Sequence, residues 1–597
     1  MKKITQFFVL LAIGASLLVF QSCKEDEKIE PAPIVDVDPT AAANIPGNKV
    51  SANVTVTAPN GGKSLVIYVS GVEAETKDIS TLDLSAPIAY EYTIPTSAVI
   101  GSVIVVSFQA VDNKDYPSAI TNFIISVGDP VIKLEGTLTT QTLDATKPYL
   151  LKGQVFVPSG VTLTIPEGTV IKGDKATKAA LIIQPGGKLI ANGTAAKPIV
   201  FTSAQSIGER DRGDWGGVII LGNAWVNQSA KPAIEGITPS QTYGNITSPS
   251  TSADENSGSL KYVRIEYAGV ELTPNNETNS LTLGAVGNAT TLDYVQVSFG
   301  GDDGFEWFGG TVNAKHLVSL STWDDDFDTD FGWSGNVQWG LSVRNPFFAD
   351  QSGSTAFESD NQGNANDTPS GAVGYTQGVF SNVSVFGPVD FNTGLGSSGT
   401  SARTISGNYT RAMHIRRRTA QSIFNSVISG WSVGLTMDDQ ATLDNFTAGA
   451  GVLSNNVMFA PNTTANAEFG STVAGAAATT VKDFWTNGAN IVEKPAASGA
   501  NGGWSPVPGT PATSVNPYAA YGLDKALFFA AYTASTYPSN PNFAISTGSL
   551  TGQTPATLFS NAKLGTFFDK TLTYKGAFGG TDWTDTWAEF QPQAKVY

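Results

Sequence analysis

Alternating apolar and polar residues dominate the chain between positions 45 and 129. Apolar side chains recur at every second position in 50–56, 65–69 and 90–94, and turn formers such as Asn60–Gly62 separate the runs. A period of two is that of a β-strand with one buried face, and no helical period is visible. Residues 45–129 are therefore predicted to form a two-sheet β-sandwich of the immunoglobulin-like type.

From position 131 onward the apolar runs become shorter, and glycine stands at the corners between them. Examples are 163–165, 181–183 and 199–201, with Gly168 and Gly186 in the intervening turns. Strands this short do not hold together as hairpins, but they are stable when each coil of a solenoid packs on the next. The pattern therefore predicts a solenoid of β-strands.

A repeat of 22 residues defines this solenoid more closely. Val295 aligns with Leu317 and Trp339, and Phe305 aligns with Phe327. Further pairs at this spacing are Val297 with Ser319 and Leu341, Gly310 with Gly332, Met413 with Leu435, Ile415 with Met437, and Phe424 with Phe446. A sustained period of this length with strand texture is typical of one coil of a parallel β-helix, whose inward columns would contain these apolar pairs.

The repeat also sets the limits of the predicted domains. Upstream, Val263 aligns with Val295 at a spacing of 32, which places a loop-like insertion around 272–279. The β-helix is predicted over residues 130–460. Residues 461–597 have few apolar periods at first and are predicted to be a decorated excursion that folds back to cap an open end, because bare sheet edges recruit other chains.

Three stretches of this region resemble a known family. They are Gly300–Gly310, Trp323–Asp328 and Trp583–Trp587. These stretches are similar to those of the β-helix lipoproteins of Bacteroidota, within the wider pectate-lyase-like group. The resemblance covers about 130–597 and implies an all-β chain whose main body is a right-handed parallel β-helix. It implies little about activity, because most members are uncharacterised.

The first residues read as an export signal. Met1–Lys3 is basic, Phe7–Phe20 is apolar but too short for a comfortable membrane span, and Cys23 is the only cysteine of the chain. We therefore predict a lipoprotein signal peptide at 1–22 and acylation of Cys23, with palmitate or a similar chain as the membrane anchor. Residues 23–44, which include Pro31–Ala32–Pro33, are predicted to be a tether.

The acidic stretch that follows Cys23 bears on where the anchored protein resides. Residues 24–30 resemble the export signal of Bacteroidota surface lipoproteins, which predicts exposure on the outer face of the outer membrane. The alternative is that this stretch is only a solvated tether, with the protein facing the periplasm.

Charge narrows the range of partners. The chain has a net charge of −17, and removal of Lys2 and Lys3 with the signal lowers the basic residues from 35 to 33 against 52 acidic ones, a net charge of −19. Such a field repels phosphate backbones, so nucleic acid is excluded as a partner. The predicted partners are the membrane, through the lipid, together with an extracellular glycan or an outer-membrane receptor.

Acidic residues recur in the repeat at positions predicted to point outward. Residues 22 apart lie one above another at roughly 4.8 Å in a β-helix. Two unit charges at that distance repel by about 3–4 kcal/mol at an effective dielectric near 20. The acids predicted to stack in this way are Asp302 with Asp324, Asp303 with Asp325, and Glu306 with Asp328 and Asp350.

Three arrangements would make this stacking tolerable. Ca²⁺ would bridge carboxylates of successive coils, because hard oxygen ligands are those it binds. Basic neighbours would pair with them, although Lys315 and Arg344 are few for so many acids. Full solvation would screen them. All seven acids are therefore candidate Ca²⁺ ligands, and solvation or a set of catalytic carboxylates are the alternatives.

Two further groups are candidates for ligand binding. Arg416 and His414 are predicted to point outward, with Arg416 above Asp438, either as charge pairs between coils or as a site for an acidic sugar. Tryptophans cluster beside the acids and would form a sugar platform if exposed, or core packing if buried. The candidate ligand-binding residues are Trp307, Trp323, Trp333, Arg344, His414 and Arg416.

These observations favour a non-catalytic surface protein that binds or scaffolds an extracellular glycan or a partner outer-membrane protein. The sequence contains no nucleophile elbow or phosphate loop, and the chain has only two histidines, so no catalytic residue is assigned. The alternative is a Ca²⁺-dependent lyase or a glycosidase of the β-helix type, in which Asp324, Asp325 and Asp328 would act with Arg344.

Overall fold

The computed structural model divides the chain into two compact units, Met1–Pro130 and Val131–Tyr597. It describes residues 30–273, 276–362, 374–389, 406–460, 466–473, 478–493, 521–523 and 538–597. The signal peptide and Cys23 lie outside these ranges, so the predictions made for them are not tested by the structure. Within the ranges, no helix is long and apolar enough to cross a membrane.

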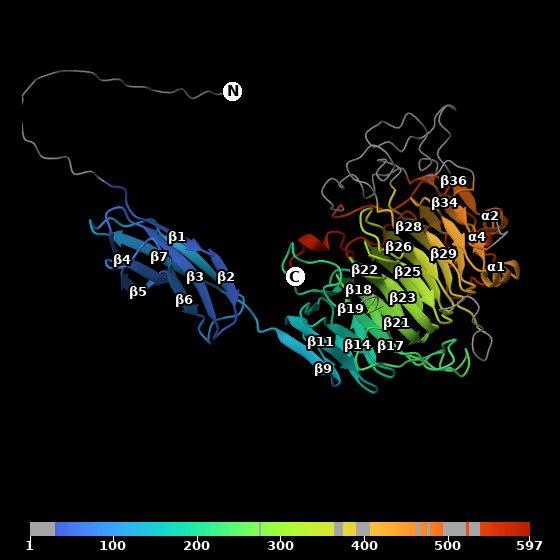
Figure 1. Cartoon of the computed structure of the whole chain (residues 1–597), viewed down its shortest axis with the longest axis horizontal. Coiled ribbons are helices and arrows are strands. Elements are labelled where there is room, and N and C mark those ends of the chain that lie inside the picture. The colour runs from blue at the N-terminus through green and yellow to red at the C-terminus, as the bar shows by residue number, and fades with distance from the viewer. Residues whose placement is uncertain are drawn as a thin grey trace, which may run out of the picture. The chain divides into compact units, whose positions relative to one another are not determined.

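The first unit consists of two β-sheets (Figure 1). Three antiparallel strands form one sheet in the order β1-β3-β6, and five strands form the other in the order β2-β8-β7-β4-β5. Their bounds are β1 (Ile34–Asp38), β2 (Ala41–Asn44), β3 (Lys49–Thr57), β4 (Gly62–Val69), β5 (Val72–Asp78), β6 (Ile88–Thr93), β7 (Val103–Asp112) and β8 (Thr121–Val127). Apolar residues such as Val54, Phe108 and Phe123 form the core of this unit, as an immunoglobulin-like sandwich requires.

The sandwich begins earlier than the sequence pattern indicated. Residues 34–44 were assigned to the predicted tether, yet β1 pairs with β3 and β2 pairs with β8. Val35 and Val37 are buried in the sandwich core. The alternation in this segment covers only two inward residues, which is too short to be distinguished from a tether by periodicity.

The largest sheet of the second unit has 26 strands within the described residues, and every pairing in it is parallel (Figure 1). The strands are β9 (Ile132–Thr137), β10 (Gln141–Thr142), β11 (Tyr149–Val157), β12 (Thr162–Ile165), β13 (Val170–Gly173), β14 (Ala180–Ile183), β15 (Lys188–Asn192), β16 (Ile199–Ser203), β17 (Val218–Leu221), β18 (Gly258–Glu266), β21 (Leu281–Val286), β22 (Thr291–Ser298), β23 (Phe305–Gly310), β24 (Asn313–Leu320), β25 (Phe327–Asp330), β26 (Asn336–Val343), β27 (Phe357–Ser359), β28 (Val379–Phe386), β29 (Met413–Ile415), β30 (Ser422–Phe424), β31 (Val427–Ser429), β32 (Leu435–Met437), β33 (Leu453–Ser454), β34 (Val457–Phe459), β35 (Phe469–Gly470) and β36 (Ile491–Glu493). This arrangement is a parallel β-helix, as predicted, and its strands continue past residue 460.

Three runs of stacked strands enclose the core of the β-helix. The run that carries the candidate site, here called face A, is β17-β21-β23-β25-β27-β29-β32-β35. The long strands β18, β22, β24, β26 and β28 bend in the middle, so that their two halves belong to two further faces. Phe305, Phe327 and Phe357 stack inside face A with ring centroids 5.9 and 5.5 Å apart.

The 22-residue register is confirmed at most of the positions that define it. Val263 pairs with Val295, Val295 with Leu317, and Phe305 with Phe327. The upstream insertion contains a hairpin of β19 (Glu271–Thr273) and β20 (Asn276–Glu277). Downstream, Met413 pairs with Leu435 and Ile415 with Met437.

The register is wrong at three predicted pairs. Leu317 pairs with Gly340 and Ser319 with Ser342, so Trp339 and Leu341 are each displaced by one residue. Phe424 pairs with Ser454, whereas Phe446 lies in helix α1 (Gln440–Thr447). One extra residue and one inserted helix account for these differences, because each lengthens its coil.

The displacement places Trp339 at the bend of its strand and not in the inward column. Tyr262, Tyr294, His316 and Trp339 all have positive φ at this corner. Their rings stack in a column with centroids 4.4, 4.0 and 4.6 Å apart. A left-handed conformation is costly for non-glycine residues, and stacking of rings on successive coils offsets part of that cost.

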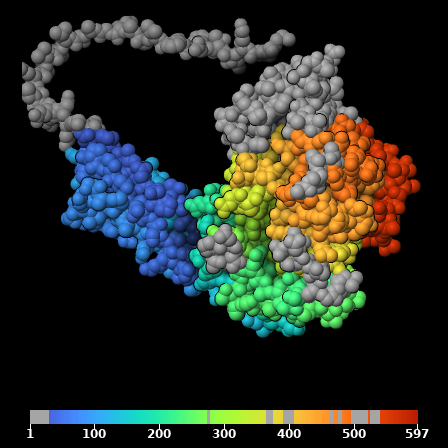
Figure 2. Space-filling model, turned by 45° about the vertical axis from the view of Figure 1, so that its right-hand side comes forward, coloured from blue at the N-terminus to red at the C-terminus, as the bar shows by residue number. Residues whose placement is uncertain are grey.

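The described part of the C-terminal segment folds back along the side of the β-helix. The ring of Tyr521 packs on Phe459 of a late coil. Tyr597 donates a hydrogen bond to Glu266 of an early coil. Between these points Trp583 and Trp587 contact the aromatic column at the corner. Figure 2 shows this segment in red as a layer beside the late coils in orange. The remaining helices are α2 (Ala478–Asn487), α4 (Pro555–Leu558) and the 3-10 turn Pro592–Ala594.

We predict that Phe327→Ala destabilises the β-helix strongly. Phe327 has no exposed surface and contacts aromatic rings of the coils on both sides, so its removal leaves a cavity that costs about 3–5 kcal/mol. Urea unfolding monitored by circular dichroism measures the loss. Ile246→Ala, at a side chain that is 43% exposed, serves as the control and is expected to change little. Equal effects of the two substitutions would contradict the inward register.

Candidate functional site

Face A carries a column of polar residues on its outer surface. The inward residues of four successive strands are Phe305, Phe327, Phe357 and Met413, and the residue after each points outward. The outward column is Glu306, Asp328, Glu358, His414 and Thr436. Alternation along each short strand, combined with the parallel register, therefore places three acids in succession on neighbouring coils.

Asp350 does not belong to this column, contrary to the prediction. Glu358 occupies the predicted place, because the coil after Asp328 is longer than 22 residues. Asp350 instead accepts hydrogen bonds from the indole of Trp323 at 2.7 Å and from the backbone of Ser352 at 2.7 Å. Burial opposes its ionisation, but these hydrogen bonds lower the pKa of Asp350. The side chain of Asp350 therefore stabilises a turn and is not a member of the acidic column.

Asp303 and Asp325 stack at the corner that precedes face A, as predicted. The backbone N–H of Asp303 donates to the side chain of Asn279 at 3.2 Å, and that of Asp325 donates to Asp303 at 2.7 Å. The backbone of Thr355 then donates to Asp325. In each of these side chains, one oxygen thus accepts a hydrogen bond from the backbone of the next coil. The second carboxylate oxygen of Asp303 and of Asp325 takes no part in this ladder.

Two groups of three carboxylates come together beside this ladder. One is formed by Asp302, Asp303 and Asp324, and the other by Asp303, Glu306 and Asp328. Each group offers oxygen atoms that lie within 4.8 Å of one another. Five of the seven predicted metal ligands therefore converge around Asp303, and oxygen donors at such spacing suit a hard divalent cation.

The carboxylates of these groups are poorly solvated. Burial, followed by the charges of neighbouring acids, raises the pKa of Asp303, Glu306 and Asp328 well above the usual value. One side-chain oxygen of Asp328 is buried and accepts no hydrogen bond from the described residues. Removing like charges from water is costly unless a proton or a cation neutralises them.

Glu235 and Asp324 extend this acidic region. Desolvation by surrounding atoms, followed by the charge of Glu277, raises the pKa of Glu235 to about 7, although this residue keeps exposed surface. Burial is also the main reason that the pKa of Asp324 rises to about 6, although Ser352 donates a hydrogen bond to it at 2.8 Å. The sequence pattern did not indicate Glu235, because this residue lies in a long loop outside the repeat.

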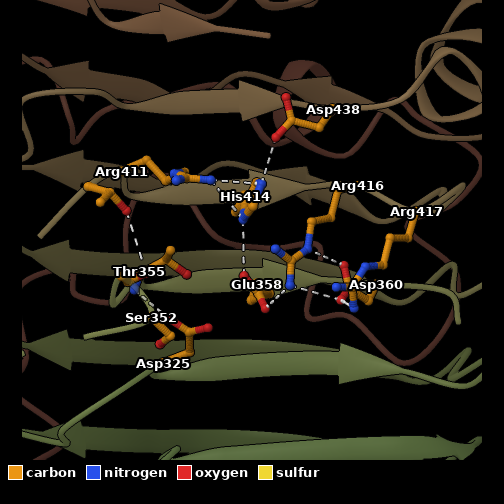
Figure 3. A network of polar contacts seen from close by, with 12 residues as sticks. Asp325, Ser352, Thr355, Glu358, Asp360, Arg411, His414, Arg416, Arg417 and Asp438 are labelled. Carbon is orange, nitrogen blue, oxygen red and sulfur yellow. Dashed lines mark hydrogen bonds and ion pairs between the residues drawn. The ribbon is translucent and has the colours of Figure 1, made fainter. Parts of the chain in front are cut away.

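Basic side chains gather at the other end of the column. His414 lies between Glu358 and Asp438, with its ring nitrogens 3.0 and 2.9 Å from their carboxylates (Figure 3). Arg416 contacts both Glu358 and Asp360, and Arg417 contacts Asp360. Arg416 therefore pairs with the preceding coil, and the predicted pairing with Asp438 on the next coil is wrong.

This pairing changes how the acids titrate. Burial opposes ionisation of Glu358 and Asp438, but the hydrogen bond from His414 outweighs it. The pKa of Glu358 is lowered, with Arg416 contributing, and the pKa of Asp438 falls to about 2. Face A is therefore neutralised at its basic end and holds surplus negative charge around Asp303.

A small pocket opens between these two ends. It has a volume of about 130 Å³ and is lined by Asp324, Asp325, Ser352, Gly353, Glu358, Arg411, His414 and Arg416. Every side chain that lines it is polar or charged, so it suits a hydrated or polyhydroxylated group. Two of the predicted ligand-binding residues, His414 and Arg416, lie here.

The predicted tryptophan platform is wrong for two of its members. Trp307 and Trp333 have no exposed surface and pack in the interior of the β-helix. Trp323 is partly exposed, but the guanidinium of Arg212 lies 3.7 Å from the centroid of its ring. None of the three therefore offers an open ring face on the acidic surface.

Arg344 is also misplaced by the sequence prediction. Its side chain is fully buried and lies 3.1 Å from the carboxylate of Asp326, which is buried as well. Ser319 and Ser342 complete the hydrogen bonds of Asp326 at 2.6 Å each. Asp326 and Arg344 thus form an internal ion pair beneath the acidic turn, and Arg344 is out of reach of a ligand.

The raised pKa values predict that stability falls with rising pH. An acid whose pKa is raised by folding costs no stability below its unfolded pKa of about 4, and it costs stability as pH rises toward its folded pKa. In EDTA, the free energy of unfolding should therefore decrease between about pH 4.5 and about pH 7.5, through the pKa values of Asp324 (about 6) and Glu235 (about 7).

Urea unfolding across that pH range checks this prediction. Asp328→Asn removes one of the interacting charges and should flatten the dependence, whereas Asp254→Asn, at an exposed acid, should leave it unchanged. A wild-type stability that rises steadily between these pH values would show that the acids are not buried as described.

More than half of the chain matches the profile of a known protein family. Residues 136–504 match the profile of a pectate-lyase-like β-helix domain. No curated protein matches the chain.

Among solved structures, the fibronectin(III)-like modules of Clostridium thermocellum CbhA are 20% identical, with 17% of this chain and 49% of that chain covered and a TM-score of 0.14. That match thus spans about half the length of the CbhA chain. The PKD domain of an M14-like peptidase from Thermoplasmatales archaeon SCGC AB-540-F20 is 19% identical, with 17% and 100% covered and a TM-score of 0.13. Scores this low carry no argument about fold or function.

Proposed function

The chain belongs to the pectate-lyase-like β-helix family, and we propose that it is a lipid-anchored surface protein of the Bacteroidota type that binds an extracellular glycan on face A. A divalent cation, Ca²⁺, is held beside the glycan by Asp303, Glu306 and Asp328. The observation that carries this proposal is the convergence of two buried carboxylates and one half-buried carboxylate, with no basic side chain among them in the described part of the chain.

The cation accounts for a charge arrangement that is otherwise unfavourable. Unit charges about 4.8 Å apart repel by about 3–4 kcal/mol at an effective dielectric near 20, and the cluster contains several such pairs. Ca²⁺ binds six to eight oxygen ligands and tolerates irregular geometry, so carboxylates from two coils with added water would suit it. Protons would neutralise the same carboxylates. Neutralisation by protons and neutralisation by the cation are distinguished by their dependence on pH.

A glycan is favoured over a protein partner by the chemistry of the pocket. Its lining contains carboxylates, guanidinium groups and a hydroxyl but no apolar side chain. Protein interfaces depend on buried apolar and aromatic anchors, whereas sugars present hydroxyl groups that need donors and acceptors together. An outer-membrane receptor as partner would instead have to contact another surface.

Binding without turnover is the form of this proposal that the site favours. In the lyase or glycosidase alternative Arg344 would act with the acids, but Arg344 is buried in an internal ion pair. His414 and Arg416 line the pocket but are engaged by carboxylates on two coils. The alternative would be favoured by release of an unsaturated uronate from a uronate polymer, measured by ultraviolet absorbance and lost on His414→Ala. No product is expected.

We predict that Ca²⁺ stabilises the protein through this site. A ligand present at about 100 times its Kd adds ~2.7 kcal/mol to the folded state, which raises the melting temperature by a few degrees. Calorimetric melting in EDTA and then in Ca²⁺ measures the shift at neutral pH. Asp328→Asn should reduce the shift while raising the melting temperature in EDTA, since it removes repulsion.

Asp254→Asn is the matched control, because it removes an exposed acid of the same unit and should keep the full shift. A melting temperature that Ca²⁺ leaves unchanged in the wild-type protein would remove the metal from the proposal. A shift that persists in Asp328→Asn would move the metal to another group of acids.

Surface display is tested on whole cells. Cys23 precedes the described residues, and acylation there followed by the acidic stretch 24–30 supports exposure to the medium. Added protease should remove the protein from intact cells, and Cys23→Ala should release it from the membrane fraction. Resistance to protease until the cells are lysed would place the protein on the periplasmic side.

A further inference from the structure

We propose that the pocket on face A recognises a dipolar sugar, one that carries a protonated amine and an acidic substituent such as a sulfate or carboxylate. The inference rests on the proposed glycan binding and names the class of sugar. It is carried by two groups of opposite charge that line one small cavity. The carboxylate of Asp324 has one oxygen without a hydrogen-bond donor among the described residues, and the guanidinium of Arg411 has no carboxylate partner among them.

The acidic side of the pocket has an unused acceptor. Ser352 donates to one oxygen of Asp324 at 2.8 Å. The other oxygen of Asp324 is buried and accepts no hydrogen bond from the described residues. Asp325, beside it, has one oxygen engaged by the backbone of Thr355. A buried acceptor without a donor is costly, so a ligand that donates hydrogen bonds here would be stabilised.

The basic side has a guanidinium without a carboxylate. Arg411 Nη1 lies 2.8 and 3.0 Å from the two ring nitrogens of His414. Those nitrogens also face Glu358 and Asp438 at 3.0 and 2.9 Å. Arg411 thus contacts an imidazole ring and not a carboxylate, so its guanidinium charge has no anionic partner among the described residues.

Arg411 differs in this respect from its neighbours. Arg416 and Arg417 are within 3.1 Å of Glu358 or Asp360 (Figure 3). No carboxylate of the described ranges lies within 4.0 Å of Arg411. Guanidinium groups bind sulfate and carboxylate through paired hydrogen bonds, so Arg411 is the position at which an acidic substituent would bind.

The size and composition of the pocket limit the ligand further. A volume of about 130 Å³ is small for a ligand site, since pockets for drug-sized ligands measure about 300–1,000 Å³. It therefore admits the charged substituents of one sugar residue and not an oligosaccharide. A purely anionic sugar would meet Asp324 and Asp325 unfavourably, and a purely cationic one would leave Arg411 without a partner.

Calorimetric titration of the full chain in Ca²⁺ with four matched monosaccharides tests the inference. The probes are glucosamine sulfated on its primary hydroxyl, its N-acetylated form, unsulfated glucosamine and glucose. The dipolar sugar is expected to bind about tenfold more tightly than either singly charged sugar, and glucose more weakly still. An amino acid, serine, is included because it shares the dipolar chemistry. Binding of serine as tight as that of the dipolar sugar would overturn the assignment to a sugar.

Two variants assign the contacts. Arg411→Met should make the dipolar sugar bind no better than glucosamine, and Asp324→Asn should make it bind no better than its N-acetylated form. Arg418→Met is the control, since Arg418 lies over Tyr375 and does not line the pocket. Equal affinity for all four sugars, or an order that survives both variants, would overturn the inference. The Ca²⁺-dependent melting shift is measured separately, so loss of the cation site and failure of this inference are distinguishable.

Discussion

The stacking of one coil on the next by parallel backbone hydrogen bonds is the constraint on which the rest of this structure depends. Neighbouring strands in such a ladder lie about 4.7–4.9 Å apart, so residues at the same position in successive coils are forced into contact. Inside face A this contact is favourable, and Phe305, Phe327 and Phe357 form a continuous stack. Outside, the same ladder brings Glu306, Asp328 and Glu358 together, where contact is unfavourable.

The repulsion between these stacked acids is reduced in different ways along face A. At the later coils, Arg416 and the ring of His414 lie beside Glu358, so a guanidinium and a hydrogen-bonding imidazole follow the acid on the next coil. At the earlier coils, one oxygen of Asp303 accepts a hydrogen bond from the backbone of the next coil, and the other oxygen belongs to the acidic cluster. The described coils carry no cationic side chain among the acids around Asp303, so negative charge is in excess there. The proposed cation would supply the missing positive charge.

The sequence predicted the parts of this arrangement that depend on regular spacing. Phe305 above Phe327 and Asp303 below Asp325 followed from the 22-residue period, because coils of that length keep side chains in register. Glu358 was missed because an insertion lengthens its coil, so Asp350 stood at the expected spacing instead. Spacing also does not distinguish a corner from a strand, which is why the environments of Trp339 and Arg344 were not foreseen. The lateral course of the C-terminal segment depends on long-range packing that has no periodic signal.

A crystal structure of the protein grown in the presence of Ca²⁺ tests the central claim most directly, because the claim is one about where a cation binds. The account predicts electron density for one ion among the carboxylates of Asp303, Glu306 and Asp328, with oxygen ligands at about 2.3–2.6 Å. Carboxylates that approach one another with no ion between them, at a pH where Ca²⁺ is saturating, would show that protons neutralise the cluster and would contradict the account.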